Sequence, residues 1–169
     1  MLFRQATSDD LERLVDVQQD GAVQGLAHIF PQDSYPFPRA ALVRRWSEEV
    51  TDPHTHVYVS TDDAGSITGF AATRETELLH FGTAARTWGS GLAQQLHDSL
   101  LHAYTRTAPP DVTRIWLRVF EANRRARRFY EKLGWSETGR RSRTSFPPHP
   151  ELLEYQRALD PWKSGGWPR

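Results

Sequence analysis

Hydrophobic residues recur along the chain with two alternating periods, one helical and one extended. Helical spacing predicts four helices, which start near residues 9, 39, 91 and 124. Apolar alternation and β-branched or aromatic runs predict strands over 2–6, 57–60, 67–73, 75–83, 112–120, 137–144 and 152–159. This order of elements, with its strand–helix–strand units, is that of an α/β domain with a mixed sheet.

The segment 123–135 contains the most sharply delimited of these helices. Its apolar stripe shares one helical face and consists of Ala126, Phe129, Tyr130 and Leu133. Asn123 stands where an N-cap residue is expected, and Gly134 stands where a left-handed residue ends a helix. Strand, cap, helix and glycine therefore follow one another within about thirty residues.

The length of 169 residues suits one domain, expected over 1–160 and followed by a flexible tail over 161–169. The absence of cysteine excludes disulfides, thiolate metal sites and a cysteine nucleophile. No run of 18 apolar residues occurs, and the first residues lack the apolar core of a signal peptide. We therefore expect a cytoplasmic protein that does not enter a membrane.

The formal net charge is zero, with 21 basic and 21 acidic residues, so no overall field favours nucleic acid or a membrane surface. The charge is nevertheless uneven, because the first third of the chain is rich in acids and 124–143 is strongly basic. The arginines of the predicted helix surround its apolar stripe, and we interpret them as a solvated face: Arg124, Arg125, Arg127 and Arg128.

A loop that contains two glycines lies between the strand predicted over 75–83 and the helix that starts near 91. It reads Arg86-Thr87-Trp88-Gly89-Ser90-Gly91. Glycines let a backbone approach a ligand closely, and a helix start offers free N–H groups and a positive dipole to a phosphate. Glycine is also common in strand-to-helix connections, so the loop by itself fits either a ligand site or a plain connection.

Together with the 123–135 segment, this loop resembles the GNAT superfamily of acetyl-CoA-dependent N-acetyltransferases. The resemblance covers roughly residues 75–135 and rests on the Arg-x-x-Gly-x-Gly loop, followed at a typical distance by the Asn123 segment. It implies the GNAT fold, a mixed and splayed sheet of about six to seven strands flanked by about four helices. It also implies acetyl-CoA as cosubstrate.

By the same resemblance, the loop would cradle the CoA pyrophosphate through Arg86, Thr87, Trp88, Gly89, Ser90, Gly91 and Leu92. The Val-x-Pro that the family usually carries just before the loop is replaced by Phe81-Gly82-Thr83. In relatives this strand holds the thioester carbonyl through a backbone N–H, for which Phe81 is the candidate here, with Thr83 close by. Asn123 resembles the residue that contacts the pantetheine arm, and this role is compatible with an N-cap.

Tyr130 matches a tyrosine that protonates the departing thiolate in many relatives; a phenol is neutral at pH 7 and can donate directly. Packing on the sheet is the alternative. A base is also needed, because only a free amine is nucleophilic. Glu77 is the first candidate and Glu75 the second, since alternate residues of a strand share a face, and an ion-paired strand end is the alternative for both. His80 is then expected on the opposite face, in a structural role.

His54 and His56 could form a pair on one strand face, but no third ligand is apparent, so no metal is expected. A contact between the 3′-phosphate of CoA and one of the arginines of 124–128 is a further option under the resemblance.

The resemblance thus implies an N-acetyltransferase that moves the acetyl group of acetyl-CoA to a primary amine of a small molecule, with Tyr130 as acid. The acceptor would lie against 28–38 and 145–150, which are rich in proline and aromatic residues. Acids near the N-terminal helices would suit a cationic amine. Acetylation of a protein N-terminus or lysine stays open, as does a CoA-binding sensor or interaction module without catalysis. The oligomeric state is open too, with a homodimer as one option.

Overall fold

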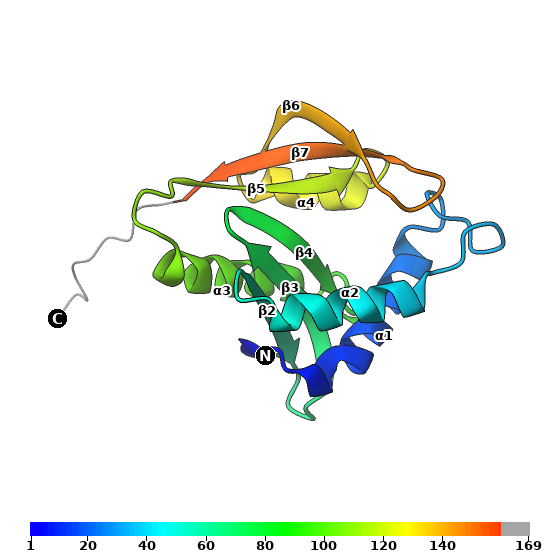
Figure 1. The fold of residues 1–169 in the computed structure, drawn as a ribbon, viewed down its shortest axis with the longest axis horizontal. Coiled ribbons are helices and arrows are strands. Elements are labelled where there is room, and N and C mark those ends of the chain that lie inside the picture. Colours follow the sequence, from blue (N-terminus) through cyan, green and yellow to red (C-terminus); the bar gives the residue numbers. More distant parts are fainter. Residues whose placement is uncertain (160–169) are drawn as a thin grey trace.

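A seven-stranded mixed sheet runs through the structure, with helices on both of its faces (Figure 1). The computed structural model describes residues 1–159, and the tail expected over 161–169 lies outside them. The strand order is β1-β2-β3-β4-β5-β7-β6. Within the described residues, β4 and β5 form the one parallel pair. The α/β class and the mixed sheet predicted from the sequence are confirmed.

The elements lie where the hydrophobic pattern predicts them, with ends displaced by a few residues. The strands are β1 (Leu2–Gln5), β2 (Thr55–Thr61), β3 (Ile67–Arg74), β4 (Glu77–Thr83), β5 (Arg114–Phe120), β6 (Ser136–Arg143) and β7 (Glu151–Ala158). The helices are α1 (Leu11–Gly25), α2 (Arg39–Thr51), α3 (Leu92–Thr107) and α4 (Arg124–Lys132). Two 3₁₀ turns that the pattern does not predict, η1 (Ser8–Asp10) and η2 (Ala85–Thr87), precede α1 and α3.

Two hydrophobic clusters, one on each face of the sheet, divide the helices between them. One cluster joins α1 and α2 to the strands through Leu14, Val15, Trp46, Val57, Val59, Phe70 and Ala72. The other joins α3 and α4 through Tyr58, Ala71, Leu100, Leu117, Tyr130, Leu153 and Tyr155. Successive residues of β2 and β3 alternate between the clusters, because side chains of a strand point to opposite faces.

The sheet divides into two halves between β4 and β5. These strands are paired at only two positions, Glu77 with Trp116 and Leu78 with Leu117. Figure 1 shows β1–β4 in one half and β5, β7 and β6 in the other, with β4 and β5 diverging. The splay expected from the resemblance is therefore present, and it opens on the carboxyl-terminal side of Leu78.

A buried carboxylate holds the start of α1 against β1. Asp10 is 1% exposed and receives two hydrogen bonds from the Arg4 guanidinium, at 2.7 and 2.8 Å. It also accepts from the Thr7 backbone N–H at 2.9 Å and from Arg13 at 3.0 Å. The Arg4 hydrogen bonds, helped by those from Thr7, hold the pKa of Asp10 well below its ordinary value against the opposing effect of burial.

We expect Asp10→Asn to lower the free energy of unfolding at pH 7 by about 2 kcal/mol, the contribution of charge-assisted hydrogen bonds. A carboxylate whose pKa is depressed by folding stabilises the protein above its unfolded pKa of about 3.9, and this stability is lost as the pH falls below that value. The difference between wild type and variant should therefore shrink in acid. Urea unfolding at several pH values tests this, with Asp9→Asn, at an exposed position, as control. An equal loss in the control, or a constant difference in acid, would contradict this account.

Candidate active site

The gap between β4 and β5 is the feature around which the candidate residues gather. Past Leu78, β4 has no partner strand on the β5 side within the described residues. Backbone groups of 79–83 that face the gap are thus available to a ligand, because they are not used in the sheet. Phe81, the candidate for holding the thioester carbonyl, lies on this stretch, and Thr83 ends it.

A β-bulge in β4 changes which side chains share a face. Thr73 pairs with Leu78 and Ala72 pairs with His80, so Leu79 is an extra residue without a partner on β3. Leu79 packs in the cluster beneath α1 and α2, whereas Leu78 and Phe81 belong to the cluster beneath α3 and α4. The bulge therefore moves His80 onto the face that carries Glu77, and the expectation that these two residues point to opposite faces is wrong.

Glu75 does not lie on the strand, which corrects the expectation that it shares a face with Glu77. Arg74 and Glu77 are the last pair of the β3–β4 hairpin, so Glu75 and Thr76 form a two-residue turn. Glu75 has a φ of 50°, in the left-handed region, and its side chain is exposed. Its carbonyl accepts a hydrogen bond from the Tyr104 hydroxyl at 2.9 Å.

Glu77 lies at the point where β4 and β5 begin to diverge. One of its carboxylate oxygens accepts from two nitrogens of Arg118, at 2.9 and 3.1 Å. Arg118 alternates with Leu117 and Val119 on β5 and so lies on the face opposite α4. The ion pair that was the alternative interpretation of Glu77 is present, and a base role for Glu77 stays a prediction.

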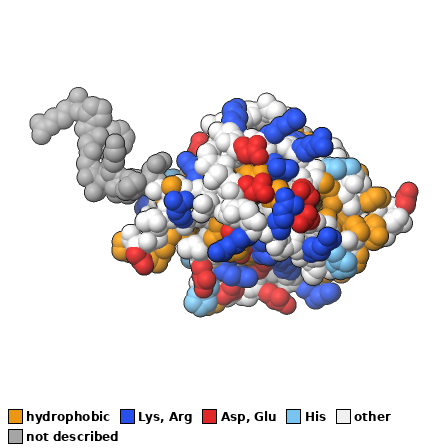
Figure 2. Space-filling view, turned by 90° about the horizontal axis from the view of Figure 1, so that it is seen from above, with side chains coloured by type: hydrophobic (Ala, Val, Ile, Leu, Met, Phe, Trp, Pro, Cys, Tyr) orange, Lys and Arg blue, Asp and Glu red, His pale blue; other side chains and the backbone are white. Residues whose placement is uncertain are grey.

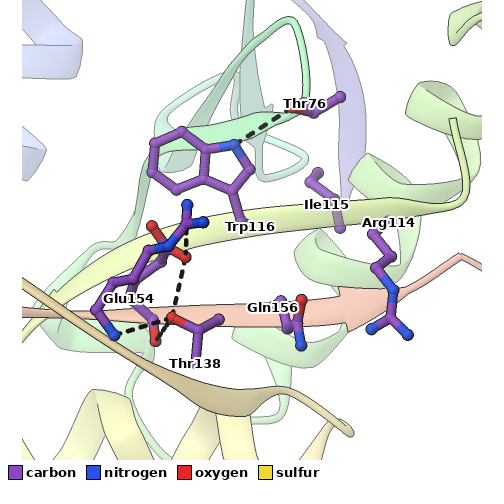
Figure 3. A pocket seen from close by; sticks show the side chains of 8 residues that line it. Thr76, Arg114, Ile115, Trp116, Thr138, Glu154 and Gln156 are labelled. Carbon is purple, nitrogen blue, oxygen red and sulfur yellow. Dashed lines mark hydrogen bonds and ion pairs between the residues drawn. The ribbon is translucent and has the colours of Figure 1, made fainter.

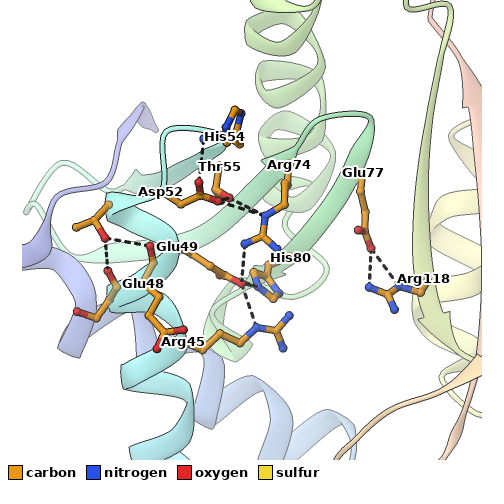
Figure 4. A network of polar contacts seen from close by, with 12 residues as sticks. Arg45, Glu48, Glu49, Asp52, His54, Thr55, Arg74, Glu77, His80 and Arg118 are labelled. Atoms are coloured by element: carbon orange, nitrogen blue, oxygen red, sulfur yellow. Dashed lines mark hydrogen bonds and ion pairs between the residues drawn. The ribbon is translucent and has the colours of Figure 1, made fainter.

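His80 and Glu49 form a pair on the same face (Figure 4). The His80 Nε2 atom lies 2.8 and 3.0 Å from the two carboxylate oxygens of Glu49, and the His80 ring lies 4.6 Å from that of Trp46. Arg45 donates to Glu49 at 3.0 Å. Burial alone would raise the pKa of Glu49, but the hydrogen bonds from His80 and Arg45 outweigh it and hold the pKa low. Burial also lowers the pKa of His80, although Glu49 opposes this.

The geometry of this pair leaves one nitrogen of His80 free. With the hydrogen on Nε2, the imidazole donates to Glu49 and Nδ1 is an acceptor. Within residues 1–159, no group bonds to Nδ1, and this atom is not sealed from solvent. Glu49 was not among the expected site residues, yet the sequence carries a signal for it. It shares a face of α2 with Leu42 and Trp46, so a charge falls on an apolar stripe.

Tyr130 reaches the gap from the other face of the sheet. Its ring packs edge-on against Phe81, Phe129 and Trp135, with centroids 6.3, 5.4 and 5.8 Å away. Burial raises the pKa of Tyr130, which keeps its hydroxyl protonated. No hydrogen bond joins that hydroxyl to any part of the chain that the structure describes. The ring is thus buried, whereas its hydroxyl is an unused donor that is not sealed from solvent within the described residues.

The glycine loop between β4 and α3 exposes backbone donors. Gly89 and Gly91 have φ of 83° and 85°, which residues with a side chain rarely adopt, and a Cβ at either would meet nothing within 4 Å. No described backbone group accepts from the N–H of Gly89, Gly91 or Ala93. These donors and the amino-terminal end of α3, whose first residue is Leu92, suit an anion.

The side chains of the loop mostly bind the loop itself. The Thr87 hydroxyl donates to the Ala84 carbonyl at 2.7 Å, and the Ser90 hydroxyl donates to the Thr87 carbonyl at 2.6 Å. Arg86 turns toward the β2–β3 turn, 3.3 Å from the Ile67 carbonyl. Backbone rather than side chains is therefore the part of this loop that is open to a ligand.

Asn123 caps α4 as the sequence predicts, because its Oδ1 accepts from the Ala126 N–H at 3.2 Å. Gly134 has the expected left-handed conformation, with a φ of 85°. The segment that follows α1 lies against this part of the chain. The His28 Nε2 atom is 3.0 Å from the Ala122 carbonyl, and Phe30 packs edge-on against Phe120 at 5.3 Å.

A cavity of about 570 Å³ lies on the face of the sheet that carries Glu77 and Arg118 (Figure 3). It is lined by Thr76, Arg114, Ile115, Trp116, Thr138, Arg140, Glu154 and Gln156. The Trp116 indole donates to the Thr76 hydroxyl at 3.3 Å and lies 5.7 Å from the Arg118 guanidinium carbon. Trp116 thus lines the cavity and also contacts Arg118, the partner of Glu77. None of these lining residues is among those that the sequence predicts for the site.

Several arginines of 124–143 form ion pairs with acidic side chains. Arg141 lies 3.1 Å from Glu121, 3.2 Å from Glu151 and 3.8 Å from Glu137. Figure 2, which views the molecule from above Figure 1, shows basic side chains with acidic ones among them and apolar side chains gathered at one end. Within residues 1–159, no three His, Asp or Glu side chains gather as a metal site, and no helix is long and apolar enough to cross a membrane.

The chain resembles known proteins both in sequence and in structure. The model of the family described as "Acetyltransferase (GNAT) family" matches residues 3–135. Uncharacterised N-acetyltransferases of Mycobacterium tuberculosis and Mycobacterium bovis are each 33% identical over 104 residues. The match covers 58% of this chain and 64% of each relative, which is less than two thirds of their length.

Solved structures match over nearly the whole chain. The ribosomal-protein-S18-alanine N-acetyltransferase from Escherichia coli has a TM-score of 0.70 at 16% identity and covers 98% of both chains. The spermidine N-acetyltransferase from Vibrio cholerae, solved with CoA and spermine, has a TM-score of 0.69 at 15% identity, covering 95% of this chain and 96% of that one. At such identities the likeness shows the fold alone.

The glycine loop allows a matched test of its backbone donors. We expect Gly91→Ala to weaken CoA binding about tenfold, because relief of the strain turns the N–H groups away from an anion. Gly65→Ala, in the β2–β3 turn, is the control, since Gly65 has a φ of 80° and equally open surroundings. Both variants should lose about 1 kcal/mol of stability, but only the first should lose affinity in calorimetric titration with CoA. Equal CoA affinity in the two variants would show that the loop donors do not contact the cofactor.

Proposed function

The chain belongs to the acetyltransferase (GNAT) family, and on that premise we propose that it is an acetyl-CoA-dependent acyltransferase that acetylates the primary amine of a small molecule. The observation that carries the proposal is the gap between β4 and β5. Tyr130 lies against one face of β4 there, and the His80–Glu49 pair and Glu77 lie on the other. An acid and a base can thus reach one reacting centre from opposite sides.

In the proposed reaction, residues of the gap orient the thioester and the amine for direct attack. Backbone N–H groups past Leu78, with Phe81 as the candidate, stabilise the oxyanion that forms when nitrogen attacks the carbonyl carbon. As the carbon–sulfur bond breaks, the Tyr130 hydroxyl supplies a proton to the thiolate. The amine loses its proton to the base. Holding both substrates in register supplies much of the rate enhancement, so no covalent enzyme intermediate is needed.

We assign the base to His80, positioned by Glu49, ahead of Glu77. Both oxygens of Glu49 face Nε2 of His80, which leaves Nδ1 as the acceptor. The carboxylate of Glu77 is instead occupied by Arg118. Glu75 is the weakest candidate, since it lies in the hairpin turn.

The acceptor is assigned to the cavity beside Trp116, on the face that carries His80 and Glu77. Its volume and mixed lining suit a small molecule, and the spermidine N-acetyltransferase neighbour acts on a small amine. Ion pairs reduce the negative charge that the N-terminal helices could present to a cationic acceptor. Glu12 and Asp16 both bind Arg39, and Asp10 binds Arg4, so these acids are already neutralised.

Two alternatives remain testable against this proposal. A protein amino terminus is favoured by one neighbour, the ribosomal-protein-S18-alanine N-acetyltransferase. A sensor or interaction module would bind CoA without turnover. A cytoplasmic location and a homodimer stay predictions.

The direct test is release of CoA thiol from acetyl-CoA in the presence of a panel of amines. The panel should contain polyamines, amino acids, aromatic amines and peptides with free amino termini. Turnover with a small amine supports the proposal. Turnover with peptides alone would identify a protein acetyltransferase, and CoA binding without turnover on any amine would favour the module.

Tyr130→Phe tests the acid. The variant keeps the buried ring and removes only the hydroxyl, so we expect kcat to fall roughly 100-fold, while affinity for acetyl-CoA changes less than about twofold. Steady-state kinetics and calorimetric titration measure the two quantities. An unchanged kcat would rule out Tyr130 as the proton donor.

The pH dependence of kcat/KM tests the base. His80 must be neutral to accept a proton, and burial lowers its pKa, so kcat/KM should fall in acid at a pH below the ordinary imidazole pKa of about 6.5. The charged groups that face it are Glu49 and Arg45 on α2, Glu77 on β4 and, near Glu49, Arg74. Glu49→Gln should move the acid limb to lower pH, because the carboxylate that supports the imidazolium is gone.

Three further variants complete this test. His80→Gln should abolish the acid limb and lower kcat, Glu77→Gln should retain the limb, and Glu48→Gln, at an exposed neighbour, should behave as wild type. If the fall of kcat/KM in acid disappears in Glu77→Gln and persists in His80→Gln, Glu77 and not His80 is the base.

A further inference from the structure

Trp88, in the glycine loop, contacts β4, α1 and α4. Its indole N–H donates to the Thr83 carbonyl at the end of β4, at 3.2 Å. One edge of the ring packs on α1, where a Cβ at Gly25 would lie 3.2 Å from the indole and a Cβ at Gly21 would lie 3.9 Å from it. Gly21 lies in the interior of α1, where glycine costs about 1 kcal/mol relative to alanine, and Gly25 is the last residue of this helix. Room for the indole is a physical reason for their presence.

One face of the indole is covered by Arg125. The guanidinium carbon of Arg125 lies 3.4 Å from the centroid of the Trp88 ring. Arg125 is in the first turn of α4, which follows β5, whereas Trp88 follows β4. The stacked pair therefore bridges the two halves of the sheet on the carboxyl-terminal side of the β4–β5 gap.

Arg125 has no acidic partner among the described residues. Partial burial lowers the pKa of its guanidinium, which nevertheless stays charged. A guanidinium that stacks on a ring keeps its N–H edge free for an anion, and its planar fork matches two phosphate oxygens. The free N–H groups of Gly89 and Gly91 belong to the same loop as the indole, and that of Ala93 lies in the first turn of α3.

We propose that Arg125, held over the indole of Trp88, binds the pyrophosphate of the acyl donor and so selects coenzyme A thioesters over shorter ones that lack phosphate. The proposal rests on the cofactor assignment of the proposed function but not on turnover. The N–H groups of the loop would bind the pyrophosphate from one side, and the guanidinium of Arg125 would bind it from the other. The indole preorganises the guanidinium, which reduces the entropy lost when the phosphate binds.

The test is the dissociation constant, by calorimetric titration, of three ligands: CoA, 3′-dephospho-CoA and pantetheine. Arg125→Gln should weaken CoA and 3′-dephospho-CoA by the same factor, about tenfold, and leave pantetheine unchanged. Arg125→Lys keeps the charge without the planar fork and should recover only part of the affinity. Arg106→Gln is the matched control, because it removes the same charge from the exposed last turn of α3, about 20 Å along that helix from the loop.

Fluorescence provides a second readout that does not depend on turnover. Trp88 is one of six tryptophans, and its emission is isolated by comparison with Trp88→Phe. CoA should change this emission in wild type, and the change should be smaller in Arg125→Gln.

Three results would overturn the proposal. Unchanged CoA affinity in Arg125→Gln would show that the guanidinium does not contact phosphate. An equal loss of affinity for pantetheine, which has no phosphate, would show that Arg125 acts on the pantetheine arm or on the fold. A loss for CoA but not for 3′-dephospho-CoA would assign Arg125 to the 3′-phosphate. Absence of acetyl transfer would refute the proposed function and leave these binding results interpretable.

Discussion

The short parallel pairing of β4 with β5 is the constraint on which the other features depend. Two paired positions hold the halves of the sheet together, and beyond Leu78 the strands separate. A separation in mid-sheet is costly unless its exposed backbone groups find other partners. Here the separation places Tyr130 on one side of a gap and His80 on the other, with the glycine loop at its end. The same divergence that weakens the sheet thus creates the space in which we propose that the acyl donor binds.

Charge burial beside this gap is a second physical feature. Glu49 is almost fully buried, and a buried carboxylate is tolerated only with close partners, which His80 and Arg45 supply. An apolar pair of the same volume would serve stability at least as well. An imidazole next to a carboxylate at this position therefore fits a proton-transfer role, and the same contacts anchor α2 to β4.

The sequence predicted the elements well because their hydrophobic periods are clear. The helical stripes of α1, α3 and α4 and the alternation in β2 and β3 all have the faces expected of them. The order of strands was not predictable in the same way, since the insertion of β7 between β5 and β6 depends on pairing between residues far apart in the chain. The cap at Asn123 and the left-handed Gly134 were predictable, because local chemistry determines both.

The catalytic side of the site was less predictable, for an identifiable reason. One extra residue at Leu79 shifts the alternation of β4, so a period-two argument placed His80 on the wrong face. The two-residue turn removed Glu75 from the strand. Arg125 and Trp88 are 37 positions apart, and their stacking follows only from the fold. Residues within one regular element were therefore predictable, whereas bulges and contacts between elements were not.

The central claim is that the acyl donor lies in the gap between β4 and β5. The most direct measurement is the change in backbone amide resonances of the isotopically labelled protein on titration with CoA. The account predicts the largest changes at 79–83 and 86–93, smaller ones at the start of α4, and none in β1 or the β2–β3 turn. Unperturbed amides at 79–83, with changes concentrated elsewhere, would contradict it.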